Sequence, residues 1–102
     1  MSFAVRFTEE AETDLIRLYQ FILARDETDW SLAEKALEAI RQALRSLGQS
    51  PFSYRKASPG NPFLREIVIP FGGSGYVALF EIDNDHSVTV LAVRHQREDD
   101  YH

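Results

Sequence analysis

Two stretches in the first half of the chain carry apolar residues at the spacing of amphipathic helices. The first set is Ala11, Leu15, Leu18 and Ile22, and the second is Ala33, Leu37, Ile40, Leu44 and Leu47. Thr8 and Asp29 precede these stripes as suitable N-cap residues, and Gly48 follows the second one. Because few residues separate the stripes, the pattern predicts an antiparallel helix hairpin whose apolar faces point to the core.

Short apolar or alternating runs elsewhere predict four β-strands. These are Phe3–Phe7, Leu64–Pro70, Gly75–Ile82 and Ser87–Val93. Glycine-rich and Asp/Asn-rich segments separate the last three strands and predict hairpin turns. Residues 48–63, with three prolines, are expected to form a long loop. The order β-α-α-β-β-β predicts an α+β fold, with the helix hairpin packed on a small antiparallel sheet.

Length and composition predict one small domain over residues 1–102, with enough hydrophobic residues (44%) for a single core. The chain has no cysteine, which excludes disulfides and thiolate metal sites. Neither a signal-peptide pattern nor an apolar run of about 20 residues occurs, so a cytoplasmic protein without a membrane span is expected.

The net charge of −5 argues against extended nucleic-acid binding, which relies on basic residues. The histidines at 86, 95 and 102 lack the spacing of a metal site, so no metal and no cofactor are predicted. The glycine-rich segment 71–75 lacks the Lys-Ser/Thr of a phosphate-binding loop, and no helix follows Ser74 as a nucleophile elbow would require.

The last strand runs directly into a polar tail that carries Arg94, His95, Arg97 and Tyr101. Arg94 and His95 should point to opposite faces of the strand. If the sheet brings Arg65 close to Arg94, the two guanidinium groups could bind a phosphodiester while a histidine or tyrosine moves a proton. The other interpretation is a solvated end, in which the arginines pair with the acids at 98–100.

Several short segments, taken in their order, carry a resemblance to a known family. They are Val5-Arg6-Phe7-Thr8, Ala11-Glu12-Thr13-Asp14-Leu15, Pro51, Arg55, Leu64-Arg65-Glu66, Gly75-Tyr76-Val77, Val90 through Glu98, and Tyr101. With this layout, the whole chain resembles the ParE branch of the RelE/ParE superfamily, the toxin halves of bacterial type II toxin–antitoxin modules.

The resemblance implies a function and two partners. A cognate ParD-like antitoxin would wrap the toxin, and DNA gyrase would be the target, inhibited by protein contact with no reaction catalysed. Such modules serve plasmid stabilisation. Target binding would fall to the basic and tail residues, Arg65, Arg94, His95 and Arg97.

The RelE branch implies an alternative, ribosome-dependent cleavage of mRNA. In that case Arg65 and Arg94 would bind phosphates, and His95 and Tyr101 would transfer protons. The acidic net charge and the few lysines near Arg65 favour gyrase inhibition. A non-toxic interaction module is a third reading.

An antitoxin segment that folds onto the toxin must bury apolar groups. The aromatic residues outside the helix stripes are the candidates for this contact: Tyr19, Phe21, Trp30, Phe63 and Phe71. The alternative is that they close the small core.

Overall fold

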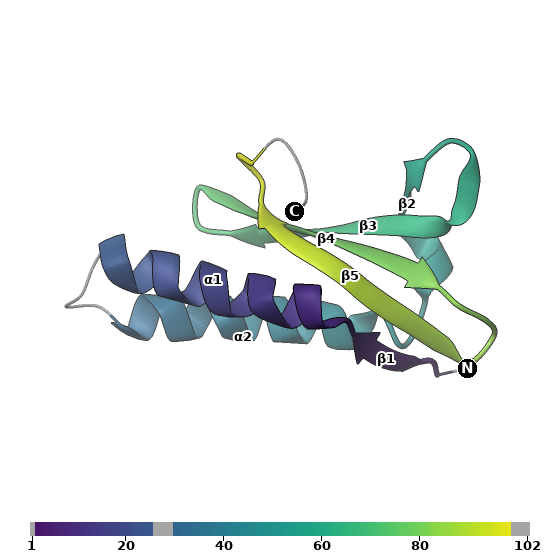
Figure 1. The fold of residues 1–102 in the computed structure, drawn as a ribbon, viewed down its shortest axis with the longest axis horizontal. Coiled ribbons are helices and arrows are strands. Elements are labelled where there is room, and N and C mark those ends of the chain that lie inside the picture. The colour runs from purple at the N-terminus through teal and green to yellow at the C-terminus, as the bar shows by residue number, and fades with distance from the viewer. Residues whose placement is uncertain (1, 26–29, 99–102) are drawn as a thin grey trace.

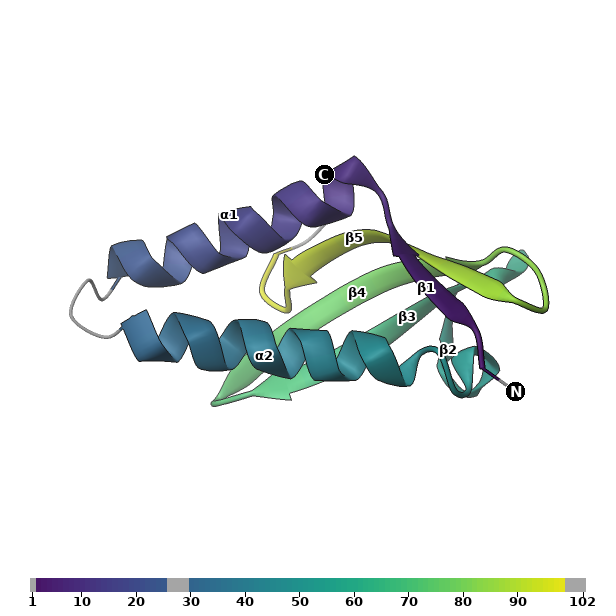
Figure 2. The ribbon, with the colours of Figure 1, turned by 90° about the horizontal axis from the view of Figure 1, so that it is seen from below.

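The computed structural model describes residues 2–25 and 30–98 and forms two layers. Its elements in chain order are β1 (Ala4–Phe7), α1 (Glu9–Arg25), α2 (Trp30–Ser46), the 3-10 turn η1 (Pro51–Ser53), β2 (Arg55–Ser58), β3 (Asn61–Phe71), β4 (Ser74–Ile82) and β5 (Ser87–His95). The two helices lie side by side in one layer and cover one face of the sheet (Figures 1 and 2).

Both predicted helices are confirmed, and their ends follow local chemistry. The Ala11 N–H donates to the Thr8 hydroxyl (3.1 Å), so Thr8 caps α1, and Glu9, Glu10 and Glu12 occupy the first turn. Just beyond α2, the Gly48 N–H donates to the Arg45 carbonyl (3.2 Å). The predicted cap Asp29 lies outside the described residues.

The sheet has five strands in the order β1-β5-β4-β3-β2, and it is mixed. The strands β3, β4 and β5 pair antiparallel, as expected, and the unpredicted β2 pairs antiparallel with β3, but β1 pairs with β5 in parallel. The helix hairpin returns the chain to the start of β1, where the Phe3 N–H donates to the Gly48 carbonyl (2.7 Å). β3 runs in the same direction as β1. The chain then reverses after β3 and again after β4, so β5 also runs in the direction of β1.

The expected loop at residues 48–63 is partly regular structure. It contains η1 and the short strand β2, whose Arg55 and Lys56 pair with Glu66 and Arg65 of β3. The sequence Arg-Lys-Ala-Ser of β2 shows no alternation of apolar residues, because β2 is a polar edge strand. β3 also begins earlier than predicted, at Asn61.

The core lies between the helices and the sheet. Ile40 and Leu44 of α2 are buried against Phe80 of β4 and Val88 and Val90 of β5. The helix stripes therefore pack on the sheet as their spacing predicted.

Helix α1 closes the part of the β5 edge that β1 does not reach. The Thr8 hydroxyl donates to the Leu91 carbonyl (3.2 Å), and the buried Asp14 carboxylate accepts the Val93 N–H (2.9 Å). A charged acceptor makes this backbone hydrogen bond a strong one. Sequence reasoning missed this role, because Asp14 looks like an ordinary polar position of the helix.

Candidate functional site

Arg65 holds the η1 turn against the start of β3. Its Nε donates to the Pro62 carbonyl (2.8 Å), and its Nη1 donates to the carbonyls of Phe52 (3.2 Å) and Tyr54 (2.8 Å). The guanidinium also lies over the Phe52 ring, 5.4 Å from its centroid. Arg65 therefore makes several contacts that order its own chain.

Arg94 donates hydrogen bonds to the backbone of the segment that follows β5. Its Nη1 donates to the carbonyls of His95 (3.2 Å), Gln96 (3.4 Å) and Glu98 (2.6 Å). These hydrogen bonds fold the segment after the strand back onto the arginine.

The sheet does not bring Arg65 and Arg94 together, so the condition for a phosphate site shared by the two arginines is not met. Arg65 lies opposite Phe80 of β4, whereas Arg94 lies opposite Val77. Residues directly opposite each other share a face, and positions three apart on one strand point to opposite faces. The two arginines consequently lie on opposite sides of the sheet.

His95 points to the helix side of the sheet, opposite to Arg94, and is held by three neighbours. The Arg97 N–H donates to its Nδ1 (3.1 Å), and its Nε2 lies 3.1 Å from the Ser74 hydroxyl. The ring also packs edge-on against Tyr76, with centroids 5.6 Å apart. Because Nδ1 accepts a hydrogen bond, the neutral ring carries its proton on Nε2, which donates to Ser74.

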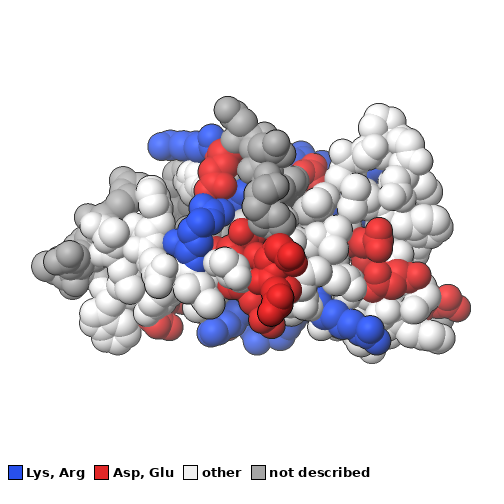
Figure 3. All heavy atoms as spheres, in the orientation of Figure 1, with Lys and Arg blue, Asp and Glu red and all other residues white. Residues whose placement is uncertain are grey.

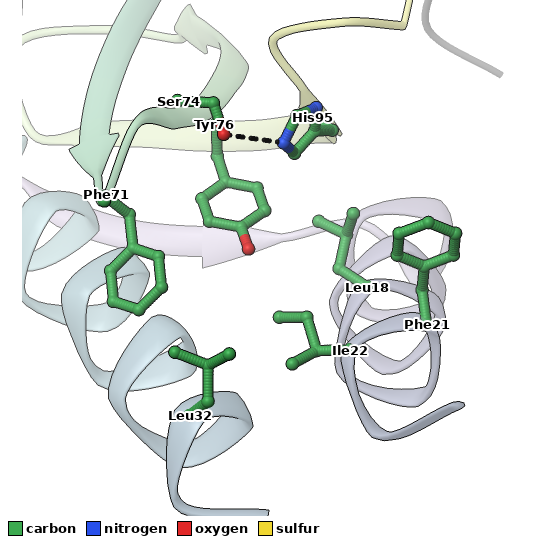
Figure 4. Close-up of a pocket in the computed structure, with 9 residues that line it drawn as sticks. Leu18, Phe21, Ile22, Leu32, Phe71, Ser74, Tyr76 and His95 are labelled. Carbon is green, nitrogen blue, oxygen red and sulfur yellow. Dashed lines mark hydrogen bonds between the residues drawn. The ribbon is translucent and has the colours of Figure 1, made fainter. Parts of the chain in front are cut away.

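His95 and Ser74 form one wall of an apolar pocket of about 450 Å³, which lies beside the second half of α1 and the start of α2. In Figure 4, the Tyr76 ring extends from the sheet toward the gap between the helices, with Leu18, Phe21 and Ile22 on one side and Leu32 and Phe71 on the other. The pocket therefore combines apolar side chains with two polar groups, His95 and Ser74, in its wall.

Burial raises the pKa of the Tyr76 phenol above its ordinary value of 10.0. The folded state then keeps a proton that the unfolded state loses above pH 10, so the free energy of unfolding should fall as pH rises beyond that value. We expect this alkaline loss to be shallower in Tyr76→Phe, measured by urea unfolding between pH 8 and pH 11. Identical slopes for the two proteins would contradict the expected role of Tyr76.

The tail is tied to α1 by an ion pair that the sequence did not reveal. Nη1 and Nη2 of Arg17 lie 3.0 and 3.4 Å from the two carboxylate oxygens of Glu98. Arg94 contacts the backbone carbonyl of Glu98, and the acids at 99 and 100 lie outside the described residues. Arg97 is exposed, and Tyr101 lies outside the described residues.

The five aromatic candidates for antitoxin binding do not form one surface. Phe21 (57% exposed) and Phe71 line the pocket beside His95, and Trp30 (63% exposed) begins α2. Phe63 (51% exposed) lies in a different pocket, at the other end of β3. The Tyr19 hydroxyl donates to Glu34 of α2 (2.9 Å), and this hydrogen bond is the main reason why the pKa of Tyr19 is raised.

Sequence reasoning also missed exposed apolar residues on the same surfaces. Ile16 lies outside the predicted apolar stripe of the first helix and is 59% exposed, and Phe52, in the expected loop, is 50% exposed. Within residues 2–25 and 30–98, no three His, Asp or Glu side chains are grouped so that they could hold a metal ion. None of the helices in these ranges is long and apolar enough to cross a bilayer.

The same arrangement of a helix hairpin on a sheet occurs in chains of two solved toxin–antitoxin systems. The fold is similar to a chain of the chromosomal ParDE system from P. aeruginosa (TM-score 0.71, 18% identity), with 92% of this chain and 96% of that one covered. It is also similar to a chain of the toxin–antitoxin complex RelBE2 from Mycobacterium tuberculosis (TM-score 0.58, 26% identity, 94% and 100% covered).

The sequence identifies the family within this class. The family model of the ParE toxin of the type II toxin–antitoxin system parDE matches residues 5–100. The chain belongs to this ParE toxin family, as its resemblance implied, and is the toxin half of a type II module. None of the curated proteins matches the chain in sequence.

Proposed function

We propose that the chain inhibits DNA gyrase by direct protein contact in the bacterial cytoplasm and that a ParD-like antitoxin neutralises it, as in plasmid stabilisation. Gyrase is favoured over RNA as the target because both arginines donate hydrogen bonds to their own chain. Arg65 and Arg94 direct guanidinium N–H groups to backbone carbonyls on opposite faces of the sheet. An RNA-cleaving site would instead need cationic groups that converge on one phosphate.

For the antitoxin we propose the pocket between the helix hairpin and the β3–β4 turn. Phe21 and Phe71 there offer apolar surface that a disordered segment could bury as it folds. Trp30 and Leu32, both exposed, extend this surface along the start of α2. The Tyr19–Glu34 hydrogen bond links the two helices and would keep the hairpin rigid for such a partner.

Two assays with purified toxin separate the readings. In a gyrase supercoiling assay, we expect inhibition that depends on toxin concentration and that disappears when the antitoxin is added. In a translating extract, we expect no cleavage of mRNA at ribosomes. Ribosome-dependent cleavage with intact gyrase activity would establish the RelE-like alternative, and growth unaffected by toxin expression would support the interaction module.

Tail variants refine the same assay. Arg97→Ala removes an exposed cation, so we expect about tenfold weaker gyrase inhibition, unchanged antitoxin binding and an unchanged Tm. Arg94→Ala serves as the comparison, since it releases the carbonyls of three tail residues and should also lower the Tm. Equal loss of antitoxin and gyrase binding in Arg97→Ala would place the tail in the antitoxin interface.

A further inference from the structure

The chain forms a tight turn directly after β5, and Arg97 lies at its tip. The Glu98 N–H donates to the His95 carbonyl (3.0 Å), which closes a four-residue turn with Arg97 in the third position. The Arg97 side chain is exposed. Figure 3 shows basic and acidic side chains next to each other at this end of β5, where Arg17 pairs with Glu98. The geometry of the turn therefore sets the direction of the cation that we propose as a gyrase contact.

Two side chains hold the backbone of this turn from opposite faces of the sheet. Arg94 donates to the carbonyls on both sides of Arg97, which are those of His95, Gln96 and Glu98. His95 lies on the helix side, and its Nδ1 accepts the Arg97 N–H (3.1 Å). This bond resembles an Asx-turn, in which a side-chain acceptor binds the N–H two residues further on. Of the two side chains, that of His95 bonds to the backbone of Arg97 itself.

The plane of the half-buried His95 ring is fixed by two neighbours on β4. Its Nε2 lies 3.1 Å from the Ser74 hydroxyl, and the ring packs edge-on against Tyr76, with centroids 5.6 Å apart (Figure 4). A hydrogen bond weakens steeply as its angle departs from linearity. A ring held in one plane consequently favours one position of the Arg97 amide.

We propose that His95 is a positioning residue, whose ring is fixed by the pocket wall and accepts the Arg97 N–H, so that the Arg97 guanidinium is presented to the target. This inference rests on the proposed function, because it takes Arg97 as a contact to gyrase. His95 itself faces the helix side and lines the pocket proposed for the antitoxin, so it acts on the target through Arg97. A contact that is ordered before binding loses less conformational entropy on binding and so raises the affinity.

The hydrogen bond depends on the protonation state of His95. A neutral ring accepts a hydrogen bond at its unprotonated nitrogen, whereas an imidazolium carries protons on both nitrogens and accepts at neither. A histidine ring gains its second proton as the pH falls toward 5. The Arg97 amide should therefore be held by the neutral ring and released in acid.

The other ionisable groups around the ring differ from His95 in this behaviour. Burial raises the pKa of Tyr76 above its ordinary value of 10.0, so the phenol stays neutral while a histidine titrates. The tail adds the charges of Arg97 and Glu98, and Glu98 is paired with Arg17 of α1. The side chains that α1 and α2 contribute to the described pocket wall are apolar.

The hydrogen bond can be tested in the full chain without any target. The ring nitrogens of His95 and the amide of Arg97 are followed by NMR from about pH 8 to about pH 5. We expect an unprotonated Nδ1 at the upper end and a shift of the Arg97 amide with the same midpoint as the ring titration. In His95→Asn, this shift of the Arg97 amide should be lost. Its absence in the wild type, or an identical titration in both proteins, would overturn the proposed bond.

Two substitutions separate the acceptor of His95 from its ring. His95→Phe keeps an aromatic ring against Tyr76 but removes the acceptor, whereas His95→Asn removes the ring but keeps an oxygen near the position of Nδ1. We expect His95→Phe to raise the toxin concentration for half-inhibition of gyrase by about fivefold, and His95→Asn by less than about twofold. The reverse order would mean that ring packing matters and the acceptor does not. The Tm of each variant shows whether it is folded at the assay temperature.

A double variant shows whether His95 acts through Arg97. Once Arg97→Ala has removed the guanidinium, the position of its backbone no longer affects the target contact. Adding His95→Phe should then weaken inhibition further by less than about twofold. Losses that multiply in His95→Phe/Arg97→Ala would show that His95 contacts the target independently, which would contradict a positioning role.

These outcomes distinguish the positioning role from the proposed function. If the wild type and His95→Phe inhibit gyrase equally well, His95 does not position the target contact, while the proposed function stands. If the wild type does not inhibit gyrase, the proposed function and the role of His95 toward that target fall together. The NMR titration then decides by itself whether the ring holds the Arg97 amide.

Discussion

Replacing Gly75 with alanine is expected to lower the free energy of unfolding by about 2–3 kcal/mol, because the new methyl group has no room. A Cβ at this position would collide with the carbonyl oxygen of Ile69, an atom of the paired strand that cannot rotate away. The Gly75 carbonyl also accepts the Gln96 N–H (2.9 Å), and Tyr76 follows directly. Urea unfolding should show the loss of stability, and altered amide shifts near His95 should show disturbance of its pocket.

The matched control is Gly73→Ala in the same hairpin. No atom lies within 4 Å of a Cβ placed on Gly73, and its backbone does not require glycine, since only Gly72 has a positive φ (61°) among the described residues. We expect a change within about 0.5 kcal/mol. Similar losses in the two variants would mean that the flexibility of the turn, and not the contact at Ile69, determines the effect.

Replacing Asp14 with alanine is expected to lower the free energy of unfolding by about 1–3 kcal/mol. The substitution leaves the Val93 N–H without its acceptor at a buried position between α1 and β5. Native-state hydrogen exchange should show faster exchange of this amide, and urea unfolding should show the change in stability.

Two comparisons isolate the hydrogen bond of Asp14 from other effects. Asp14→Asn keeps a carbonyl oxygen as acceptor and should be less destabilising than Asp14→Ala. Glu12→Ala, at an exposed position of the same helix, should change stability by less than about 0.5 kcal/mol. If exchange at Val93 is unchanged in Asp14→Ala, the carboxylate does not protect this edge of β5.

The helices were predictable because the apolar residues that repeat at helical spacing are the ones that the fold buries. Ala11, Leu18, Ile40 and Leu44 repeat at helical spacing and are all buried against the sheet. The parallel pairing of β1 with β5 was not predictable in this way, because the residue pattern of a strand does not determine which strand it pairs with. The strand β2 escaped notice because both its faces are polar or only partly buried.

The candidate site was predictable as a set of residues but not as an arrangement. The exit of Arg94 and His95 on opposite faces follows from strand geometry alone. Register decides that Arg65 and Arg94 lie apart, and register depends on long-range pairing. The contacts of His95 with Ser74 and Tyr76 likewise need the β4–β5 pairing, since they join residues about 20 positions apart.

The position of β5 between β1 and β4 has a consequence for how the chain folds during synthesis. The last strand in chain order lies between β1 and β4, so these two strands have no shared neighbour until β5 has been synthesised. Pairings between distant segments are slow to form, and their absence leaves strand edges exposed. An interrupted or nascent chain therefore lacks the complete sheet, and β1 can join β4 through β5 only after translation has passed β5.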